Sequence, residues 1–443
     1  MIDIASSSFS SSWRMYFFAS SRLLTVSASD LFFIIKSFYF FSHLLSLFLS
    51  IWHKMNINAT KTLLDDIKHI YIHVPFCDGK CNYCSFYSIK KNPANTKLYL
   101  NSLEQEIIKT TGGTKLNPFT IYIGGGSPSL LNSSELKQFL KIIKNNFDLS
   151  NLKEWTFEVN PSSACSTILY LLKENGINRI SIGVQSFSDK TLSKLGRRYN
   201  NNSIHAAICL IKEFSFDNFN IDLIAAVPGT SEQEWKNDLY AAINYGPSHM
   251  SVYTLSIEEG SLLQKMFLTG KWRKENEITE IKRINTAEKF LRKHGLRRYE
   301  ISNYSQKDCE CIHNVAFWEG KDYLGFGPSA VSRIQNMRLT NPSSLETWAK
   351  IVQNAPFSQE TELLSWAKDS AERIGFAFRL LKKPVNPLLF TKENSIFFDS
   401  WNKIITELIS QKIIMKKNNG YVLTKRGVNF ADYVASLFIN NVE

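Results

Sequence analysis

The sequence predicts an α/β fold, in which a partial (β/α) TIM-like barrel precedes a small C-terminal winged-helix-like α+β domain. After Met55, short runs rich in β-branched and aromatic residues alternate with amphipathic helical runs. Repeated units of this kind indicate parallel strands, because parallel strands need helical crossovers. From about residue 345 the pattern changes, and 404–439 is typical of a helix, a hairpin and a helix. We therefore expect a barrel over 55–335 and a C-terminal domain over 345–443.

Seven runs are expected to form the strands of the barrel. Each is short, and several are apolar enough to be buried on both faces. They are 69–74, 119–124, 155–159, 179–184, 219–224, 249–255 and 297–302. Between the second and third strands, 133–146 carries apolar residues at i, i+3, i+4 and i+7 from Leu136, which predicts an amphipathic helix with Ser134 as its N-cap.

The first 54 residues differ from the rest of the chain. They are rich in Ser and Phe, and 31–52 is apolar over a length that could span a bilayer, although Lys36 and His43 interrupt it. Three interpretations stay open, namely a membrane anchor, a targeting segment, or a stretch upstream of the true start at Met55. We favour a start at Met55, because strand-and-helix sequence begins just after it.

Composition limits the class of protein. The net charge is +12, but the lysines are scattered and no nucleic-acid reader motif is visible in the first 330 residues, so we do not expect nucleic acid as a partner. The chain has 7 cysteines, an odd and sparse set, and three of them crowd one loop. A secreted disulfide framework is therefore not favoured, and we expect a reducing, cytoplasmic compartment.

Three cysteines follow the first strand. Cys77, Cys81 and Cys84 are spaced C-x3-C-x2-C, and Phe86 stands where a fourth cysteine could follow. One interpretation is a structural zinc site completed by a histidine such as His73, but that residue lies inside a strand and no second C-x2-C follows nearby. The other is a 4Fe–4S cluster whose fourth iron has no protein ligand. We favour the cluster, because an open coordination position is typical of a reactive metal site.

Further polar residues gather at the same ends of later strands. The three glycines in 121–131 would let the backbone approach an amino-acid-like ligand, or they could simply form a tight turn. Glu158 ends a strand and could accept two ribose hydroxyls, or form a surface ion pair. The same end of the barrel also carries Gln185, Arg197 and Asp222. A strand-borne Asp222 needs a partner, and Arg197 is the candidate, although that pair could be purely structural.

Together these segments resemble the radical S-adenosylmethionine (SAM) superfamily and, more narrowly, the oxygen-independent coproporphyrinogen III oxidase family. The resemblance covers about 68–335, in YIHVPFCDGKCNYCSF, GGGSPS, EVNP, NRISIGVQSF, NIDLIAAVPG and RRYEISNYS, and the C-terminal module is also similar. It implies that Cys77, Cys81 and Cys84 hold the cluster. The iron without a protein ligand would bind the amino and carboxylate groups of SAM. An electron from the cluster would then cleave SAM to methionine and a 5′-deoxyadenosyl radical. The implied SAM contacts are Tyr71, Tyr83, Gly125, Gly126, Ser127, Glu158, Gln185, Arg197 and Asp222.

Two features are similar to one branch of this family, the HemW-like haem chaperones. Coproporphyrinogen oxidases of the family carry C-x3-C-x2-C-x-C, whereas this chain has Phe86 in the last place. HNVAFW (313–318) resembles the H-N-x-x-Y-W motif of the branch, with Phe317 in place of the tyrosine. The resemblance makes His313 a candidate haem ligand, but it could equally be a hydrogen-bonded histidine of the barrel.

The branch implies that the chain binds haem and delivers it to haem proteins such as respiratory enzymes. It also implies an electron donor for the cluster. Peripheral membrane association stays open. The chain departs from the branch at Tyr199, where a histidine is usual. Cys309 and Cys311 precede His313, and we expect them to be isolated thiols. Two alternatives remain: decarboxylation of coproporphyrinogen III, and a structural zinc protein whose winged helix binds nucleic acid.

Overall fold

The computed structural model describes residues 64, 66–354, 359–391 and 396–442. The elements reported below lie in the unit 67–443. The apolar run 31–52 and the expected start at Met55 lie outside the described residues. Within the described ranges, the structure has no helix that combines the length and the apolar character needed to cross a bilayer.

A nine-stranded sheet forms the centre of the molecule. Its strands are β1 (His69–Val74), β4 (Thr120–Gly125), β5 (Glu154–Val159), β6 (Arg179–Gln185), β7 (Phe219–Ala225), β8 (His249–Thr254), β9 (Arg297–Arg298), β10 (Asn303–Ser305) and β11 (Leu324–Phe326). The order is β11-β1-β4-β5-β6-β7-β8-β10-β9. All pairs from β11 to β8 are parallel, while β10 runs antiparallel to β8 and to β9. No pairing of β9 with β11 closes the sheet among the described residues, which confirms the partial barrel.

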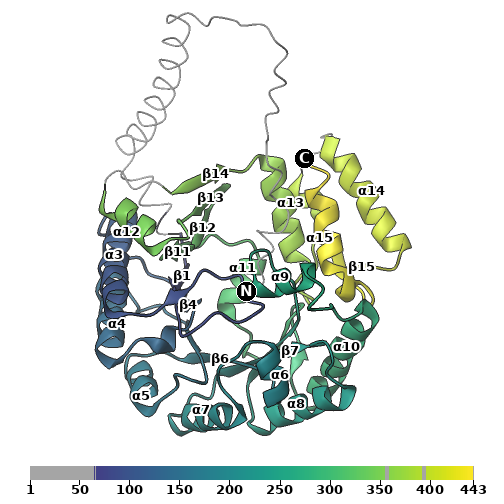
Figure 1. The fold of residues 1–443 in the computed structure, drawn as a ribbon. Coiled ribbons are helices and arrows are strands. Elements are labelled where there is room, and N and C mark those ends of the chain that lie inside the picture. The colour runs from purple at the N-terminus through teal and green to yellow at the C-terminus, as the bar shows by residue number, and fades with distance from the viewer. Residues whose placement is uncertain (1–63, 65, 355–358, 392–395, 443) are drawn as a thin grey trace, which may run out of the picture. The chain divides into compact units, whose positions relative to one another are not determined.

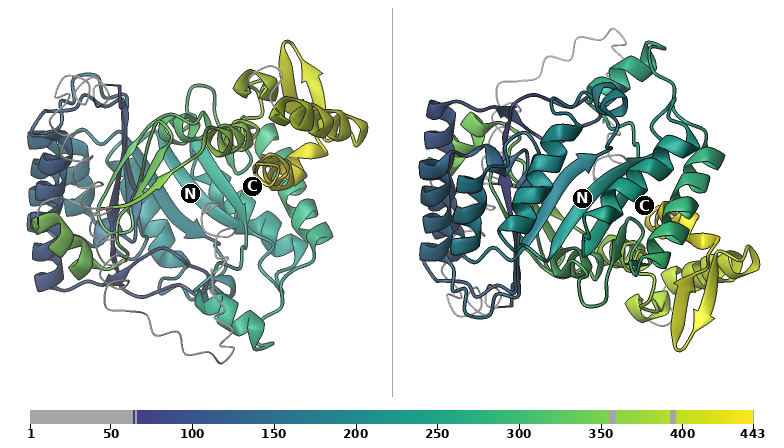
Figure 2. Two further views of the ribbon diagram at one scale, coloured as in Figure 1. Left: turned by 90° about the horizontal axis from the view of Figure 1, so that it is seen from above. Right: turned by 90° about the horizontal axis from the view of Figure 1, so that it is seen from below.

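Helices cover the outer side of these strands, as Figure 1 and the two views of Figure 2 show. The long ones are α3 (Pro93–Thr111), α4 (Ser133–Asn146), α5 (Ser166–Glu174), α7 (Asn201–Glu213), α8 (Glu232–Asn244) and α10 (Glu277–Lys293). Shorter ones lie in the connections, namely η1 (Pro128–Leu130), α6 (Asp189–Lys194), α9 (Leu262–Leu268) and α11 (Ile312–Trp318). This alternation of strand and helix is the crossover pattern that parallel strands require.

The predicted helix over 133–146 matches α4, but its predicted N-cap is wrong. The cap is Asn132, whose side chain accepts hydrogen bonds from the backbone N–H groups of Ser134 and Glu135. The Glu135 carboxylate in turn accepts a hydrogen bond from the backbone N–H of Asn132 at 2.8 Å. This reciprocal capping box satisfies more of the free N–H groups at the helix start than a cap at Ser134 would. A cap at Ser134 would lack the two reciprocal hydrogen bonds between Asn132 and Glu135.

Six of the predicted strands are found within one residue of their expected bounds, and the seventh is wrong. The run 297–302 contains only β9 and a turn, after which the chain folds back as β10. The backbone N–H of Tyr299 donates to the carbonyl of Asn303 at 3.1 Å, and the Glu300 carboxylate accepts from the Ser302 N–H at 2.8 Å. The Glu300 side chain thus stabilises a turn in the middle of a β-rich run.

Several short strands carry too few residues to show a pattern in the sequence. The pair β2 (Phe76–Cys77) and β3 (Ile89–Lys90) is parallel. A separate antiparallel sheet consists of β12 (Val331–Ile334), β13 (Met337–Thr340) and β14 (Glu360–Leu363). The latter sheet continues from β11 along the chain, and α12 (Leu345–Gln353) then packs on α3.

The barrel strands alternate in polarity along their length, and several of them are buried on both faces, as the sequence predicts. Within each strand, polar side chains recur at about every second position. The strands concerned are HIYIHV, TIYIGG, EWTFEV, FNIDLIA and HMSVYT. Polar members of neighbouring strands bond to one another; for example, Asn220 donates to Ser181 at 2.8 Å. One face of the sheet is therefore polar although it is enclosed, and the other face packs on the helices.

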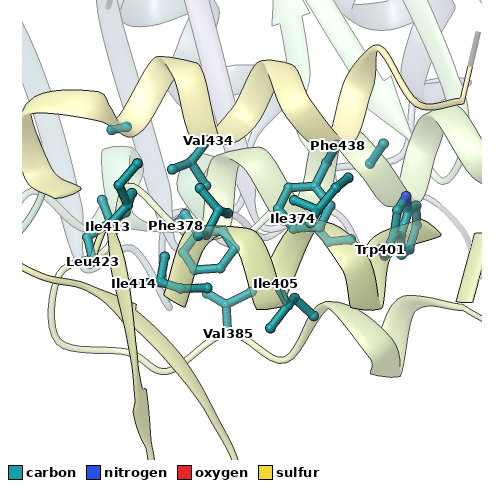
Figure 3. Packing of buried hydrophobic residues seen from close by; sticks show 14 residues of the cluster. Ile374, Phe378, Val385, Trp401, Ile405, Ile413, Ile414, Leu423, Val434 and Phe438 are labelled. Carbon is teal, nitrogen blue, oxygen red and sulfur yellow. The ribbon is translucent and has the colours of Figure 1, made fainter. Parts of the chain in front are cut away.

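The C-terminal residues form a core of their own (Figure 3). The elements are α13 (Trp366–Ala377), η2 (Pro387–Phe390), α14 (Ile396–Ser410), β15 (Ile414–Lys417), β16 (Gly420–Leu423), η3 (Gly427–Phe430) and α15 (Ala431–Ile439). The predicted helix, hairpin and helix are all present, and Asn418 turns the hairpin with φ 51°. Trp401 and Phe438 lie at the centre, with ring centroids 6.0 Å apart. The domain boundary near 345 stays a prediction.

A buried carboxyl group ties the first helix to the last parallel strand. Glu106 on α3 has no exposed surface, and it accepts hydrogen bonds from the backbone N–H of Gly327 at 2.7 Å and from the Asn341 amide at 2.6 Å. Burial raises the pKa of Glu106 to about 7, against the opposing effect of these two bonds. Gly327 follows β11, so this contact fixes the edge of the sheet beside β1.

We predict that Glu106 makes the stability of the protein depend on pH. Its pKa is higher in the folded chain than in the unfolded chain, so its contribution is fully present below about pH 4.5 and is lost as the pH rises through about 7. The rise in pKa corresponds to roughly 3 kcal/mol. The free energy of unfolding of the wild type, measured in urea at a series of pH values, should fall by up to this amount relative to that of Glu106→Gln. Glu104→Gln on the same helix should keep the wild-type slope; if it also loses the slope, Glu106 is not the source.

Candidate functional site

The cysteine loop begins where β1 ends. Cys77 is the last residue of β2, and Cys81 and Cys84 lie between β2 and β3. The two strands pair in parallel, Phe76 with Ile89 and Cys77 with Lys90. Val74 at the end of β1 pairs with Gly125 at the end of β4, so the loop and the glycine motif meet at the carboxyl edge of the sheet. This is the edge at which barrels of this type carry their chemistry.

Hydrogen bonds of Asn82 to two other connections hold the loop in place. The N–H of Asn82, between Cys81 and Tyr83, donates to the Leu195 carbonyl at 3.0 Å, and its side chain donates to the Lys194 carbonyl at 2.9 Å. The Asn82 carbonyl accepts from the Leu263 N–H on α9 at 2.6 Å. The loop is thus positioned by its backbone, independently of its three thiols.

The three thiols share this loop, but the described residues contain no group of three His, Cys, Asp or Glu side chains already gathered in a metal-holding arrangement. Burial raises the pKa of the Cys77 thiol and raises that of Cys84 to about 11, and the neighbouring Cys81 adds to both shifts. A set of close, partly buried thiols needs a positive centre to become thiolates together. An iron cluster would supply such a centre, so the chemistry of the donor set fits it.

His73 is not available as a fourth ligand. It is buried, its Nε2 lies 2.9 Å from the Tyr87 carbonyl oxygen, and its Nδ1 lies 3.1 Å from the Tyr71 hydroxyl. Burial lowers the pKa of His73 to about 4, so the ring is neutral. Both of its ring nitrogens have protein partners, which excludes the histidine named for the zinc interpretation.

The glycine motif packs closely against the loop and the neighbouring strands. A Cβ on Gly124 would lie 2.7 Å from the Glu158 carboxyl carbon, and one on Gly126 would lie 2.6 Å from the Phe76 carbonyl oxygen. Gly125 has φ 100°, which L side chains rarely adopt. The Ser127 hydroxyl lies 3.9 Å from the Cys77 sulfur. The predicted ligand residues Gly125, Gly126 and Ser127 therefore pack closely against their neighbours, directly beside the first cysteine.

Two carboxylates lie within the polar interior. The Tyr122 hydroxyl donates to Glu158 at 2.8 Å, and the Asn220 amide donates to Asp222 at 2.7 Å. Burial raises the pKa of Glu158, the bond from Tyr122 opposes this, and the charge of Asp222 adds to it. A partly desolvated carboxylate pair of this kind favours a ligand that offers hydroxyl or amine donors.

The predicted pairing of Asp222 with Arg197 is wrong. Asp222 accepts from Asn220 and from the Ser181 hydroxyl at 3.4 Å. Arg197 instead donates to the Tyr83 hydroxyl and lies between two aromatic rings, 5.5 Å from the centroids of both Tyr83 and Tyr199. The Tyr199 hydroxyl donates to the Gly183 carbonyl at 2.5 Å. The cation is thus held by aromatic faces beside the cysteine loop, where it need not neutralise the carboxylate.

Backbone strain marks the end of β6. Gln185 has φ 67°, and the pairing of β6 with β7 shifts register between Ile182 and Gln185. A left-handed conformation at a residue with a side chain costs about 1–3 kcal/mol, and such residues cluster at ligand sites. The bulge re-aims the Gln185 side chain, whose amide nitrogen would lie 3.1 Å from a Cβ on Gly183.

His313 lies at the opposite end of the barrel from the cysteines. It is 4% exposed, its Nδ1 lies 2.8 Å from the Thr120 hydroxyl, and its backbone N–H donates to Glu154 at 3.0 Å. Thr120 and Glu154 are the first residues of β4 and β5, roughly 16 Å along the strands from their carboxyl ends. Burial lowers the pKa of His313 to about 3. These are the contacts of a hydrogen-bonded barrel histidine.

We call the end of the barrel that holds His313 the barrel floor. The sequence interpretation missed its polar residues. The Glu154 carboxylate accepts bonds from the first N–H groups of α11 and from the Cys311 thiol at 3.4 Å, and it faces the buried Arg179 at 4.0 Å. His249 bonds to Asn220 at 2.7 Å and to Tyr299 at 2.9 Å. The period-two alternation of polar residues in the strands is the signal that predicts them.

The remaining motif residues have local roles. Phe317, in place of tyrosine, packs against Tyr323 and Phe376 with centroids 5.4 Å away in each case. Cys311 is buried, and Cys309 is half-buried. Neither belongs to a metal-holding group among the described residues. Phe86 is 37% exposed on the cysteine loop.

Comparison with known proteins identifies relatives of the chain. A family model described as the radical SAM superfamily matches residues 71–239. The heme chaperone HemW of Buchnera aphidicola subsp. Schizaphis graminum is 32% identical over 378 residues, which cover 84% of this chain and 98% of the relative. The heme chaperone HemW of Bacillus subtilis is 28% identical over 383 residues, which cover 85% of this chain and 100% of the relative.

A solved structure shares the fold. Coproporphyrinogen III oxidase (HemN) from Escherichia coli, described as a radical SAM enzyme, matches with a TM-score of 0.73 at 21% identity and covers 86% of this chain and 93% of its own. The chain therefore belongs to the radical SAM superfamily and, within it, to the HemW-like haem chaperone branch of the oxygen-independent coproporphyrinogen III oxidase family.

Proposed function

We propose that this chain is a haem chaperone that binds a 4Fe–4S cluster, SAM and haem and delivers haem to acceptor haem proteins, with respiratory enzymes as the expected acceptors. The observation that carries the proposal is the three-cysteine loop at the carboxyl edge of the barrel, with Phe86 in place of a fourth cysteine. The HemW relatives, which match nearly their whole length, support it.

Cys77, Cys81 and Cys84 would hold the cluster. The hydrogen bonds of Asn82 fix the path of the chain between Cys81 and Cys84. When bound, the cluster supplies one-electron chemistry, and its iron without a protein ligand can take a small molecule. The half-buried loop and the nearby Tyr83 limit access of water and oxygen to this position.

SAM would lie between the loop, the glycine motif and the carboxylate pair. Gly125, Gly126 and Ser127 lie beside Cys77, and the Glu158 carboxylate would accept the ribose hydroxyls. Tyr71, Gln185 and Asp222 line the same polar interior. Tyr83 and Arg197 would bound the site on the side of the loop, since they bond to each other there.

The expected partners are haem, its acceptor proteins and a one-electron donor, with no role for nucleic acid; peripheral association with a membrane remains open. The cysteine composition favours a cytoplasmic location. Decarboxylation of coproporphyrinogen III is the competing function. The exposed Phe86 argues against it, because the oxidases of this family resemble one another in having a fourth cysteine there.

The first test separates these two functions. Anaerobically purified and reconstituted chain is incubated with haem and, separately, with coproporphyrinogen III, SAM and a reductant. We expect retention of one haem per chain and no protoporphyrinogen IX, detected by absorbance and by chromatography of the porphyrins. Porphyrin decarboxylation without stable haem binding would make the chain an oxidase.

The second prediction concerns the cluster. Cys81→Ser replaces a thiolate with a poor iron ligand, so the reconstituted variant should lose most of its iron and the absorbance near ~400 nm that iron–sulfur clusters show. Cys165→Ser changes an exposed thiol outside the loop and should retain both. Equal iron content in Cys81→Ser and wild type would contradict the three-thiolate site.

The third prediction concerns SAM. Glu158→Gln keeps the size of the side chain but removes its charge and one acceptor, which weakens charge-assisted hydrogen bonds by roughly 1.5–3 kcal/mol. Anaerobic calorimetry should show a loss of about 10–100-fold in affinity for SAM. Tyr122→Phe removes only the bond to Glu158 and should cost less. If Glu158→Gln binds SAM as tightly as the wild type, the carboxylate does not contact the ribose.

A further inference from the structure

The candidate haem ligand from the sequence, His313, is enclosed at the barrel floor, so haem cannot reach its ring in this structure without opening the packing of α11. A different surface combines the chemical groups that haem needs. It lies in the segment 262–274, LLQKMFLTGKWRK, which comprises α9 and the turn after it and carries four cationic and no acidic residues.

The apolar side chains of α9 are largely exposed. Leu262, Phe267 and Leu268 expose 51%, 43% and 76% of their surface, while Leu263 is 1% exposed and anchors the helix. A short helix with apolar residues on several sides has no partner for most of them among the described residues. Exposed apolar clusters of this kind mark sites at which a ligand or partner binds.

The chain after α9 folds back over the helix. The backbone N–H groups of Lys271 and Trp272 both donate to the carbonyl of Met266, at 2.9 and 3.1 Å. This turn brings the backbone of Trp272 next to that of Met266. The Trp272 indole N–H is buried and has no hydrogen-bond partner among the described residues. A buried donor without a partner is costly, so it favours a ligand that offers an acceptor.

This segment is joined to the cysteine loop. The Leu263 N–H donates to the Asn82 carbonyl, between Cys81 and Tyr83, at 2.6 Å. Leu263 belongs to a buried apolar cluster against which both Tyr83 and Trp272 pack. A ligand on the segment would therefore lie beside the candidate cluster site, at the carboxyl edge of the barrel.

The charges of the segment are available to an anion. Lys265, Lys271 and Arg273 are exposed and form no ion pair with a described residue, whereas Lys274 lies 3.7 Å from Glu280. Cations beside exposed apolar and aromatic groups complement a flat apolar ligand that carries carboxylates at one edge.

We propose that haem binds to the segment 262–274, with its macrocycle on the apolar side chains of α9 and Trp272 and its two carboxylates on Lys271 and Arg273. Met266 supplies a thioether that can ligate the iron. The helix is about 10 Å long, close to the width of one porphyrin and much shorter than a stable protein interface requires. The proposal rests on the proposed haem-binding function and names its site.

The test is a titration of the reconstituted full chain with haem, followed by the Soret absorbance. The double variant Phe267→Ser with Leu268→Ser should bind haem about tenfold more weakly or worse, since two large apolar contacts are lost. Leu389→Ser changes a side chain that is 80% exposed in η2, and it should bind haem as the wild type does. Met266→Leu keeps the apolar volume and should shift the Soret band if the thioether ligates the iron.

The carboxylates of haem give a second readout. Lys271→Ala with Arg273→Ala should weaken haem about tenfold but leave the affinity for haem dimethyl ester unchanged, because the ester carries no charge for these residues to bind. Lys137→Ala with Lys141→Ala, on the exposed side of α4, is the matched control and should alter neither affinity. Wild-type haem affinity in all segment variants would overturn this site and leave the chaperone function standing. Failure of the wild type to bind haem would overturn both.

Discussion

The polar face inside the barrel is the constraint on which the rest of the structure depends. Strands that alternate polar and apolar side chains must turn their polar side inward, because the helices cover the other side. Enclosed polar groups have to bond to one another, and they do so across strands, as in Tyr122 with Glu158 and Asn220 with Asp222. These bonds fix the register of the sheet and, at the same time, hold the two carboxylates that the proposed SAM site requires.

The cysteine loop depends on this frame in a different way. Its ends are set by the β2–β3 pair and its middle by Asn82, so the loop takes its course from backbone bonds to neighbouring connections. The thiols themselves contribute little to holding it.

Much of this arrangement could be predicted from the sequence, because the strands are β-rich runs of ordinary length and the cysteine spacing is specific. The failures each have a local cause. The strand over 297–302 is interrupted by a side-chain bond of Glu300, which no propensity reveals. The Arg197–Asp222 pair does not form, because aromatic rings hold the cation. Strands of two to four residues, such as β11, are too short to show a period. The burial of several strands on both faces was predicted correctly, but the polar side chains that alternate along them were not recognised as a network of hydrogen bonds.

One hydroxyl group at the barrel floor has a consequence for proton positions. The Thr120 oxygen lies 2.9 Å from Nδ1 of His69 and 2.8 Å from Nδ1 of His313. A hydroxyl carries one proton, so it can donate to only one of these rings, and the other must present an Nδ1–H. Burial keeps both rings neutral, with pKa values lowered to about 4 and about 3. At least one imidazole is therefore locked in the Nδ1–H tautomer with a lone pair on Nε2, and a single threonine decides which nitrogen of the floor remains basic.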